Sequence, residues 1–379
     1  MEITEVKTSN KRFIAALIIA SCLIAAVFAY MYIDLNQKLE SISVTSGVFN
    51  PVSLSPEEIY NRVSDSVVLV AKRENITGNM VTVSFCSGFL YDDKGHIVTA
   101  YSVIRDAEEI KVIFDNKTEV KAELLGFDEY SNLAVLNVTG NPNIVQRPLL
   151  LGDSSKLHWA ERVYIVGKVS GTENLLISGE VNGLKLPFWL KAEFPLIDAI
   201  AFSAKSLSLE TLGAPLLNSK GEVVGMIVDL ADKNSSITTL GYALSSKMMQ
   251  KIASSLIKNG EYKHPWLKGV WGIDMTQEIA NYMNINFTEG FLVTYVNSSV
   301  AAGGLQAGNR TVIIEGKNVT IGGDIIIEID DVEVKGIYDI IAYLEENKKS
   351  VVKLTVIRDG KVLKSPISWP VDAFSPPPD

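Results

Sequence analysis

The chain has 379 residues, of which 47% are hydrophobic and 21% are charged, a composition typical of globular proteins with two or three domains. Its formal net charge is −9, and it contains no run of lysine and arginine that would form a basic face. These properties argue against nucleic acid as a partner.

One long apolar segment without any charged residue lies near the N-terminus, at residues 13–33. Its length matches the roughly 30 Å hydrocarbon core of a bilayer. Two lysines and Arg12 precede the segment and Asp34 follows it. The positive-inside bias therefore predicts a signal-anchor helix with residues 1–12 in the cytoplasm and the bulk of the chain outside the cell membrane.

Two alternatives to this anchor exist. A cleaved signal peptide has a shorter apolar core and a small-residue cleavage site. The residues from Ile19 to Cys22 resemble a lipoprotein processing box, in which Cys22 is the lipidation site. The apolar run continues well past Cys22, which favours the uncleaved spanning helix.

Glycosylation sequons support the placement outside the membrane. Asn-x-Ser/Thr motifs are denser here than composition alone supplies, which suggests a glycoprotein. They occur at Asn75, Asn116, Asn137, Asn234, Asn286, Asn297, Asn309 and Asn318. Beyond the anchor, Cys86 is the only cysteine, so no intrachain disulfide is expected and its thiol is interpreted as buried and inert.

The folded part begins with a predicted helix, since Ser55 followed by Pro56 and two glutamates is a typical helix start. Short β-branched and aromatic runs separated by turn signals then predict an all-β barrel or sandwich up to about Tyr242. A helix is predicted over 245–259, ending at Gly260. A second unit with strands and two helical patches starts at His264.

Several stretches, in this order and spacing, resemble the HtrA family of trypsin-like serine proteases. They are Ser87–Leu90, Gly95–Thr99, Gly126–Leu136, Leu151–Ser154, Ile177–Val181, Gly213–Asn218 and Gly221–Gly225, and in the second unit His264–Leu267, Gly290–Val293, Ser299–Gly308 and Gly322–Ile326. The resemblance implies a mainly β protein with a trypsin-like double β-barrel and a C-terminal PDZ domain of the α+β class.

The apolar segment, the pattern of elements and the resemblance together give the expected domain boundaries. These are a cytoplasmic N-terminus at 1–12, the transmembrane helix at 13–33, a stalk at 34–54, the protease-homology domain at 55–260, the PDZ domain at 263–371 and a flexible Pro-rich tail at 372–379.

All three positions of the catalytic triad differ from the family pattern. Ser102 stands at the histidine position, Asn132 at the aspartate position and Leu212 at the position of the serine nucleophile. Leu212 has no nucleophilic atom, and the hydroxyl of Ser102 is not a base near neutral pH. Asn132 has no charge to support an imidazolium. The resemblance therefore predicts a degenerate site without catalytic residues.

Two further positions near the triad also differ from the family pattern. Glu210 replaces the glycine that the family has two residues before the nucleophile, and its carboxylate would repel a developing oxyanion. Ala204 stands where the family has an aspartate. A relocated site would need one of the three histidines, His96, His158 or His264, or a dyad of Lys205 with Ser206 or Ser208. Nothing in the spacing requires either.

The resemblance places a peptide groove on the PDZ domain, where an extended C-terminus adds to a sheet edge and a loop holds its carboxylate. The predicted peptide-binding residues are Leu267, Lys268, Gly269, Val270, Ile341 and Leu344. Lys268 lengthens the loop by one residue, so it either assists carboxylate capture or disturbs the loop. The alternative is a domain that packs on the barrel and binds nothing.

The sequence thus predicts a membrane-anchored, outward-facing pseudoprotease that acts as a peptide-binding adaptor or chaperone-like scaffold in protein quality control. The alternatives are an active serine endopeptidase with an unrecognised nucleophile, or a regulatory subunit of an active HtrA paralogue. The partners expected are peptides or protein C-termini and, by resemblance, other subunits in a homo- or hetero-trimer. No cofactor and no metal are expected.

Overall fold

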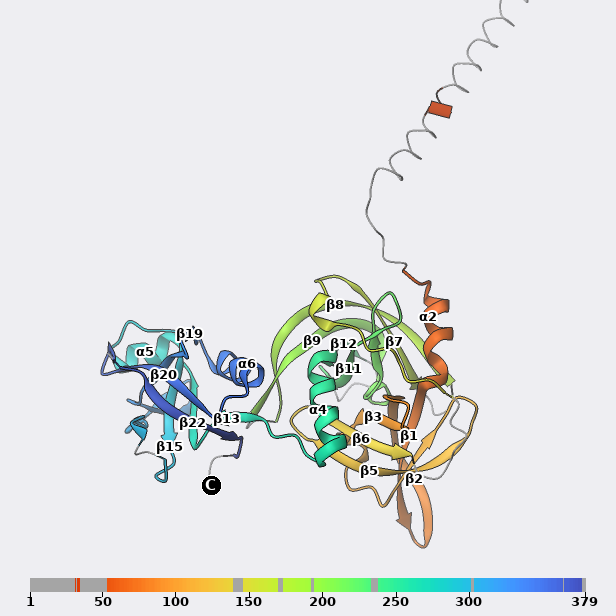
Figure 1. The fold of residues 1–379 in the computed structure, drawn as a ribbon, viewed down its shortest axis with the longest axis horizontal. Helices are drawn as coiled ribbons and strands as arrows, with labels where there is room; N and C mark the ends of the chain where they lie inside the picture. Colours follow the sequence, from red (N-terminus) through yellow and green to blue (C-terminus); the bar gives the residue numbers. More distant parts are fainter. Residues whose placement is uncertain are drawn as a thin grey trace, which may run out of the picture. The chain divides into compact units, whose positions relative to one another are not determined.

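The structure is a computed structural model that describes residues 31, 33–34, 53–138, 146–169, 173–191, 194–232, 238–300, 303–363 and 365–376 (Figure 1). Nearly all of the predicted cytoplasmic terminus, signal-anchor helix and stalk lies outside these residues. Among the residues described, no helix has the length and apolarity needed to cross a membrane. The chain from Leu54 onward forms one compact unit.

The predicted helix start at Ser55 is confirmed, because helix α2 spans Pro56–Val63 with Ser55 as its N-cap. The Ser55 hydroxyl accepts a hydrogen bond from the amide of Glu58 at 3.2 Å, and the Glu58 carboxylate accepts one from the amide of Ser55 at 2.7 Å. This reciprocal pair is a capping box.

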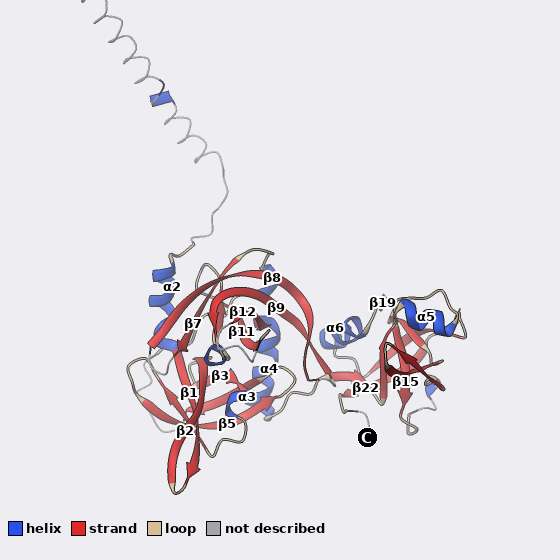
Figure 2. Ribbon diagram, turned by 180° about the vertical axis from the view of Figure 1, so that it is seen from behind, coloured by secondary structure: helices blue, strands red, loops and turns tan. Residues whose placement is uncertain are grey.

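Six antiparallel strands close into a first barrel in the order β1-β2-β3-β6-β5-β4 (Figures 1 and 2). Side chains alternate between the core and solvent along β5, which fits a strand with one wet face. The strands are β1 Val67–Ile76, β2 Asn79–Leu90, β3 His96–Ala100, β4 Glu109–Ile113, β5 Glu119–Asp128 and β6 Leu133–Val138. Short helices lie at η1 Ser64–Ser66 and α3 Tyr101–Ile104.

A second barrel follows in the order β10-β11-β12-β9-β8-β7, so the predicted double barrel is confirmed. Its long β8–β9 hairpin is visible as the wide red arch in Figure 2. The strands are β7 Arg162–Val169, β8 Glu173–Lys191, β9 Phe194–Leu207, β10 Pro215–Leu217, β11 Val223–Leu230 and β12 Thr238–Ser245, with short helices η2 Ser154–Lys156 and η3 Leu209–Thr211.

The helix predicted over 245–259 is helix α4, Ser246–Asn259. Ser245 caps its first turn by accepting from the amide of Met248 at 3.2 Å. Gly260 ends it with a left-handed φ of 77°, a conformation that glycine adopts without strain. The helix packs on β11 of the second barrel and on β5 and β6 of the first, so it joins the two barrels.

The C-terminal domain is α+β. Its main sheet has the order β13-β22-β20-β18-β15-β14, with β19 paired to β18 and β21 to β20, and β16 and β17 form a separate hairpin. The strands are β13 Pro265–Leu267, β14 Val270–Asp274, β15 Phe291–Val296, β16 Arg310–Ile314, β17 Lys317–Ile321, β18 Ile325–Ile329, β19 Val332–Glu333, β20 Val351–Arg358, β21 Lys361–Val362 and β22 Ile367–Ala373. The helices are α5 Gln277–Met283 and α6 Ile337–Asn347.

The end of the domain lies beyond the predicted boundary at 371. Strand β22 continues to Ala373, and the amide of Phe374 donates to the carbonyl of His264 at 2.7 Å. The ring of Phe374 lies 4.6 Å from that of Phe194 in the second barrel. The first residues of the predicted tail are therefore part of the folded domain.

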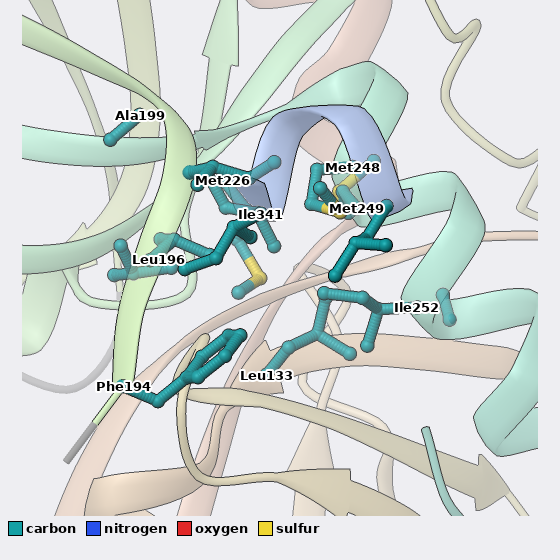
Figure 3. Close-up of a cluster of buried hydrophobic side chains, with 14 of the residues drawn as sticks. Leu133, Phe194, Leu196, Ala199, Met226, Met248, Met249, Ile252 and Ile341 are labelled. Atoms are coloured by element: carbon teal, nitrogen blue, oxygen red, sulfur yellow. The ribbon is translucent and has the colours of Figure 1, made fainter. Parts of the chain in front are cut away.

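One apolar cluster extends from the barrels into the C-terminal domain (Figure 3). It contains Leu196 of β9, Met226 of β11, Met248 and Met249 of α4, and Ile341 of α6, all of them buried. The C-terminal domain has a further core of its own, formed around α5.

Candidate functional site

The three positions that the resemblance makes equivalent to the catalytic triad, called here the triad-equivalent positions, lie where the two barrels face each other. Ser102 is in the short helix α3, Asn132 is in the turn between β5 and β6, and Leu212 follows η3. The structure brings the first two together through the backbone, because the amide of Ser102 donates to Oδ1 of Asn132 at 2.6 Å. The Ser102 side chain itself is exposed.

Asn132 links the two barrels through hydrogen bonds. Its Nδ2 donates to the carbonyl of Val228 in the second barrel at 2.7 Å, and its own carbonyl accepts from the amide of Tyr101 at 3.0 Å. Its φ is +55°, a left-handed conformation that asparagine tolerates better than most residues. An aspartate here would direct a carboxylate oxygen at the Val228 carbonyl, because it has no N–H to donate.

We predict that Asn132→Ala lowers the free energy of unfolding by about 2 kcal/mol, since it leaves a buried carbonyl and an amide without partners. Urea unfolding monitored by tryptophan fluorescence measures the change. Ser102→Ala is the matched control, because the bond to Asn132 comes from the backbone amide and survives the substitution. Equal losses in the two variants would contradict this role for the Asn132 side chain.

Leu212 closes the position of the nucleophile. Its side chain is only 5% exposed, and its carbonyl accepts from the amide of Ser87 at 3.0 Å. In acyl-transfer sites the amide of the nucleophile residue helps to hold the oxyanion. Here the amide of Leu212 donates to the carbonyl of Leu209 at 3.2 Å, inside the turn that ends η3. The amide of Leu212 is therefore already used in a hydrogen bond within its own turn.

The following glycine shows how tightly this loop is packed. Gly213 has a φ of +80°, and a Cβ added there would lie 2.2 Å from the carbonyl oxygen of Ser87. On the other side, the Ser87 hydroxyl donates to the carbonyl of Glu210 at 2.8 Å. The loop from Glu210 to Gly213 is thus held against Ser87 of β2 in two ways, by the close approach of Gly213 and by the hydrogen bond to Glu210.

Each of the three histidines has a carboxylate partner. Nδ1 of His96 lies 2.6 Å from Asp92, and Nδ1 of the exposed His158 lies 3.5 Å from Glu161. His264 lies in the segment that enters the C-terminal domain, with its Nε2 3.0 Å from Asp128. None of these partners is at a triad-equivalent position.

The Lys205 dyad considered from the sequence has no support in the geometry. Within the described part of the chain, Lys205 makes no hydrogen bond to Ser206 or Ser208. The hydroxyl of Ser208 is buried without a hydrogen-bond partner. In the same described residues, no three side chains of His, Cys, Asp or Glu gather in a way that would hold a metal ion.

Cys86 is free and buried, as predicted. Burial raises the pKa of its thiol to about 11, which keeps it in the unreactive thiol form near neutral pH.

The apolar side chains among the predicted peptide-binding residues are buried. Leu267, Val270, Ile341 and Leu344 are at most 1% exposed. The indole of Trp266 donates to the carbonyl of Val270 at 2.7 Å. The side chains expected to line an open groove are therefore covered in this structure.

Lys268, the extra residue of the loop, is not directed to a free carboxylate. Its Nζ lies 3.0 Å from the carboxylate of Asp372 in β22. Its carbonyl accepts from the indole of Trp369 at 3.1 Å, and its amide donates to the carbonyl of Pro370 at 2.9 Å. Lys268 thus fastens the loop to β22.

A buried charged network, which the sequence reasoning missed, joins the barrels to the C-terminal domain. His264 lies between Asp128 of β5 and Glu345 of α6, at 3.0 and 3.5 Å, and all three are at least 95% buried. Glu345 also pairs with Lys251 of α4 and accepts from the Tyr262 hydroxyl at 2.6 Å.

The network sets unusual protonation states. Burial by itself lowers the pKa of His264, but the carboxylates of Asp128 and Glu345 outweigh it and raise that pKa to about 9. Burial raises the pKa of Glu345, but hydrogen bonds from His264, Lys251 and Tyr262 outweigh it, so the pKa is lowered overall. Near neutral pH the network therefore carries a protonated histidine between two carboxylates.

A second ion pair, between a buried lysine and a partly exposed aspartate, was also missed. Lys168 of β7 is 1% exposed, and its Nζ lies 2.7 Å from Asp115, which follows β4 in the first barrel. The side chain of Asn174 donates to the same Asp115 oxygen at 3.0 Å and to the carbonyl of Ser64 at 2.9 Å. The one available signal was a lysine inside an otherwise apolar strand.

The sequons fall on exposed and half-buried asparagines. In the barrels, Asn75 and Asn116 are exposed and Asn137 is half-buried. In the C-terminal domain the exposed sites are Asn286, Asn309 and Asn318, and Asn297 is half-buried. Asn234 lies outside the described residues.

Comparison with known proteins is consistent with this architecture. The family model for the trypsin-like peptidase domain matches residues 86–226. A probable periplasmic serine endoprotease, DegP-like, of Pseudomonas putida (strain GB-1) is 29% identical over 283 residues, which are 73% of this chain and 54% of that protein. Protease Do-like 1, chloroplastic, of Arabidopsis thaliana is 27% identical over 264 residues, 69% of this chain and 58% of that protein.

The chain thus spans about half the length of the curated relatives it matches. Among solved structures, the HtrA-type protease AlgW with a decapeptide has a TM-score of 0.69 at 19% identity, covering 86% of this chain and all of that one. The serine endoprotease from Yersinia pestis has a TM-score of 0.60 at 19% identity with the same coverage.

Fold and similarity together define a double-barrel protein of the trypsin-like serine protease class. Within that class, the chain is similar to HtrA-type proteases.

Proposed function

We propose that this protein is a pseudoprotease of the HtrA type, a membrane-anchored and outward-facing adaptor or chaperone-like scaffold that binds peptides. The observation that carries the proposal is Leu212, a buried aliphatic side chain at the nucleophile position with its amide hydrogen-bonded to Leu209. Ser102 and Asn132 supply no imidazole and no carboxylate. Acyl transfer needs these groups together.

The proposal includes a PDZ domain over residues 263–371 and peptide binding between α6 and β14. The order of elements around α6 and the edge position of β14 support it, because among the described strands β14 pairs with β15 alone. A free strand edge is what peptide addition to a sheet requires. One solved structure with a similar fold is that of the HtrA-type protease AlgW with a decapeptide.

The anchor at 13–33, the cytoplasmic position of residues 1–12 and the glycosylation of the exposed sequons belong to the same proposal. Their support is the apolar segment flanked by positive charge and the exposure of Asn75, Asn116, Asn286, Asn309 and Asn318. Relatives named periplasmic endoproteases act outside the cytoplasm, which agrees with an outward-facing domain.

The enzymatic part is tested with a fluorophosphonate probe and a digestion assay on an unfolded protein. We expect no labelling and no cleavage by the wild-type chain. Leu212→Ser alone is expected to give none either, because Ser102 and Asn132 still provide neither base nor orienting carboxylate. Cleavage that is abolished by a single point mutation would establish the alternative, a serine endopeptidase with an unrecognised nucleophile.

A second candidate function is a regulatory subunit that assembles with an active HtrA-type paralogue. The loss of all three triad residues within a family of active proteases favours it. Co-purification of a tagged chain with an active paralogue from the same cell would support this role. Recovery of homo-oligomers alone would count against it.

A further inference from the structure

The β16–β17 hairpin is a separate part of the C-terminal domain. It fills the interval between Ser299–Gly308 and Gly322–Ile326, two stretches that resemble the family. The two strands form a sheet of their own, outside the main sheet. On one face of the hairpin, Val312, Ile314 and Val319 pack on the core around α5. The other face of the hairpin is open to solvent.

The open face carries a large apolar side chain. Ile313 is 67% exposed, more than any other large apolar side chain in the described part of the C-terminal domain. Tyr282 of α5 is 51% exposed, and its hydroxyl donates to the carbonyl of Ile313 at 3.3 Å. The side chain of Arg310 in turn donates to the carbonyl of Tyr282 at 2.8 Å. Ile313 and Tyr282 therefore lie side by side and form an exposed patch, called here the hairpin patch.

The turn of the hairpin determines which residue lies opposite Ile313. Glu315 and Gly316 both have a positive φ, +48° and +76°, as in a two-residue type I′ turn. The pair of residues that flanks such a turn is hydrogen-bonded, so the next pair, Ile313 opposite Asn318, is not. In a pair of this kind the Cα atoms are about 4.5 Å apart and both side chains stand on the same face. Asn318 thus lies beside Ile313 on the open face.

Asn318 is the first residue of a glycosylation sequon, Asn318-Val319-Thr320. Its side chain is exposed, and it makes no hydrogen bond to any residue that the structure describes. Thr320, two positions along the strand, lies on the same face and opposite Thr311. The side-chain amide of Asn318 is therefore available for modification.

We infer that Asn318 carries an N-linked glycan and that the first sugar of this glycan packs on Ile313 and covers the hairpin patch. Transfer forms a bond between Nδ2 of Asn318 and C1 of the sugar. It breaks the bond from C1 to the phosphate oxygen of a lipid-linked oligosaccharide donor, and the amide loses one proton as the lipid phosphate leaves. This inference rests on the proposed outward-facing, glycosylated state of the chain and adds a structural role for one glycan.

The contact has a physical reason. One face of a sugar ring is lined by C–H groups, so packing it on an aliphatic side chain removes apolar area from water. The hairpin also has an open edge, because among the described strands β16 pairs with β17 alone. An exposed apolar edge strand tends to pair with other chains, and a bulky hydrophilic group beside it opposes such pairing.

The modification is tested on the full chain purified from its own membranes, by mass spectrometry of the peptide that contains Asn318. Thr320→Val removes the sequon but keeps Asn318 and the shape of the side chain, and Thr320→Ser is the matched control that keeps the sequon. We expect Thr320→Val to lower the Tm by about 2 °C. It should also bind more of an apolar dye and self-associate, whereas Thr320→Ser behaves as the wild type.

Two further variants test the contact with Ile313. In an Ile313→Thr background, adding Thr320→Val should no longer increase dye binding, because the apolar side chain that the sugar covers is gone. Asn116→Gln removes a sequon in the turn between β4 and β5, where residues 114–118 include no exposed large apolar side chain. It should leave dye binding unchanged.

The outcomes distinguish this inference from the proposal on which it rests. If Asn318 were unmodified while other sequons carry glycans, the hairpin patch would be open to a protein partner and the inference would be overturned. An equal effect of Thr320→Val with and without Ile313 would also overturn it, because the glycan would then make no contact there. If no sequon carried a glycan, the proposed glycosylated state would fail together with this inference.

Discussion

The free energy of unfolding is expected to fall by about 3 kcal/mol as the pH rises from about 6.5 to about 9, because of His264. Its pKa is raised to about 9 in the folded chain by Asp128 and Glu345, against burial, which lowers it. A histidine in an unfolded chain has a pKa near 6.5. The stabilisation is therefore complete below about pH 6.5 and lost as the pH passes through about 9.

The acid side of the network gives the opposite trend. The pKa of Glu345 is lowered, since hydrogen bonds from His264, Lys251 and Tyr262 outweigh its burial. Its contribution is present above the ordinary carboxyl pKa and is lost as the pH falls through the lowered value. Both contributions are complete between the ordinary carboxyl pKa and about pH 6.5, so the attachment of the C-terminal domain to the barrels is most stable in that range.

Urea unfolding at a series of pH values, monitored by tryptophan fluorescence, measures this dependence. His264→Gln is the control, since it removes the titrating group at a position that faces the same carboxylates. We expect the variant to be less stable at about pH 6 and to lose most of the slope between about pH 6.5 and 9. The same slope in the variant and the wild type would assign the pH dependence to other groups.

The sequence predicted the elements well where local signals were strong. The capping residues Ser55 and Ser245, the terminating Gly260 and the alternating strands each depend on neighbours within a few positions. The order of the matched stretches then predicted the double barrel. The assignment of Ser102, Asn132 and Leu212 to the triad positions stays a prediction from the resemblance, and the structure adds how each residue is hydrogen-bonded.

The long-range pairs were beyond such reasoning. His264 and Asp128 are 136 positions apart, and Lys168 and Asp115 are 53 positions apart. Charged residues in a sequence indicate solvent exposure by default, and only the folded chain shows which of them are buried together. Likewise, the resemblance predicted Ile341 as a peptide-binding residue, but not that its side chain is buried in an apolar cluster shared with the barrels.

Removing the carboxylate of Asp115 is expected to have the largest single effect on stability. Asp115→Ala leaves the ammonium group of Lys168, 1% exposed, without its charged partner between the two barrels. Breaking a fully buried ion pair costs about 3–5 kcal/mol, because the remaining charge keeps its desolvation penalty. The Asp115 side chain is 37% exposed, so solvent screens the pair and we expect a loss of at most about 3 kcal/mol. The urea midpoint of the variant should shift down accordingly.

Two comparisons isolate this cause. Adding Lys168→Met to Asp115→Ala should restore most of the lost stability, since a buried pair replaced by apolar groups is often neutral. Glu119→Ala removes the partner of Lys111, a more exposed pair with a distance of 2.9 Å, and should cost at most about 1 kcal/mol. If the double variant were no more stable than Asp115→Ala, the loss would lie in the Asn174 hydrogen bond and not in the unpaired lysine.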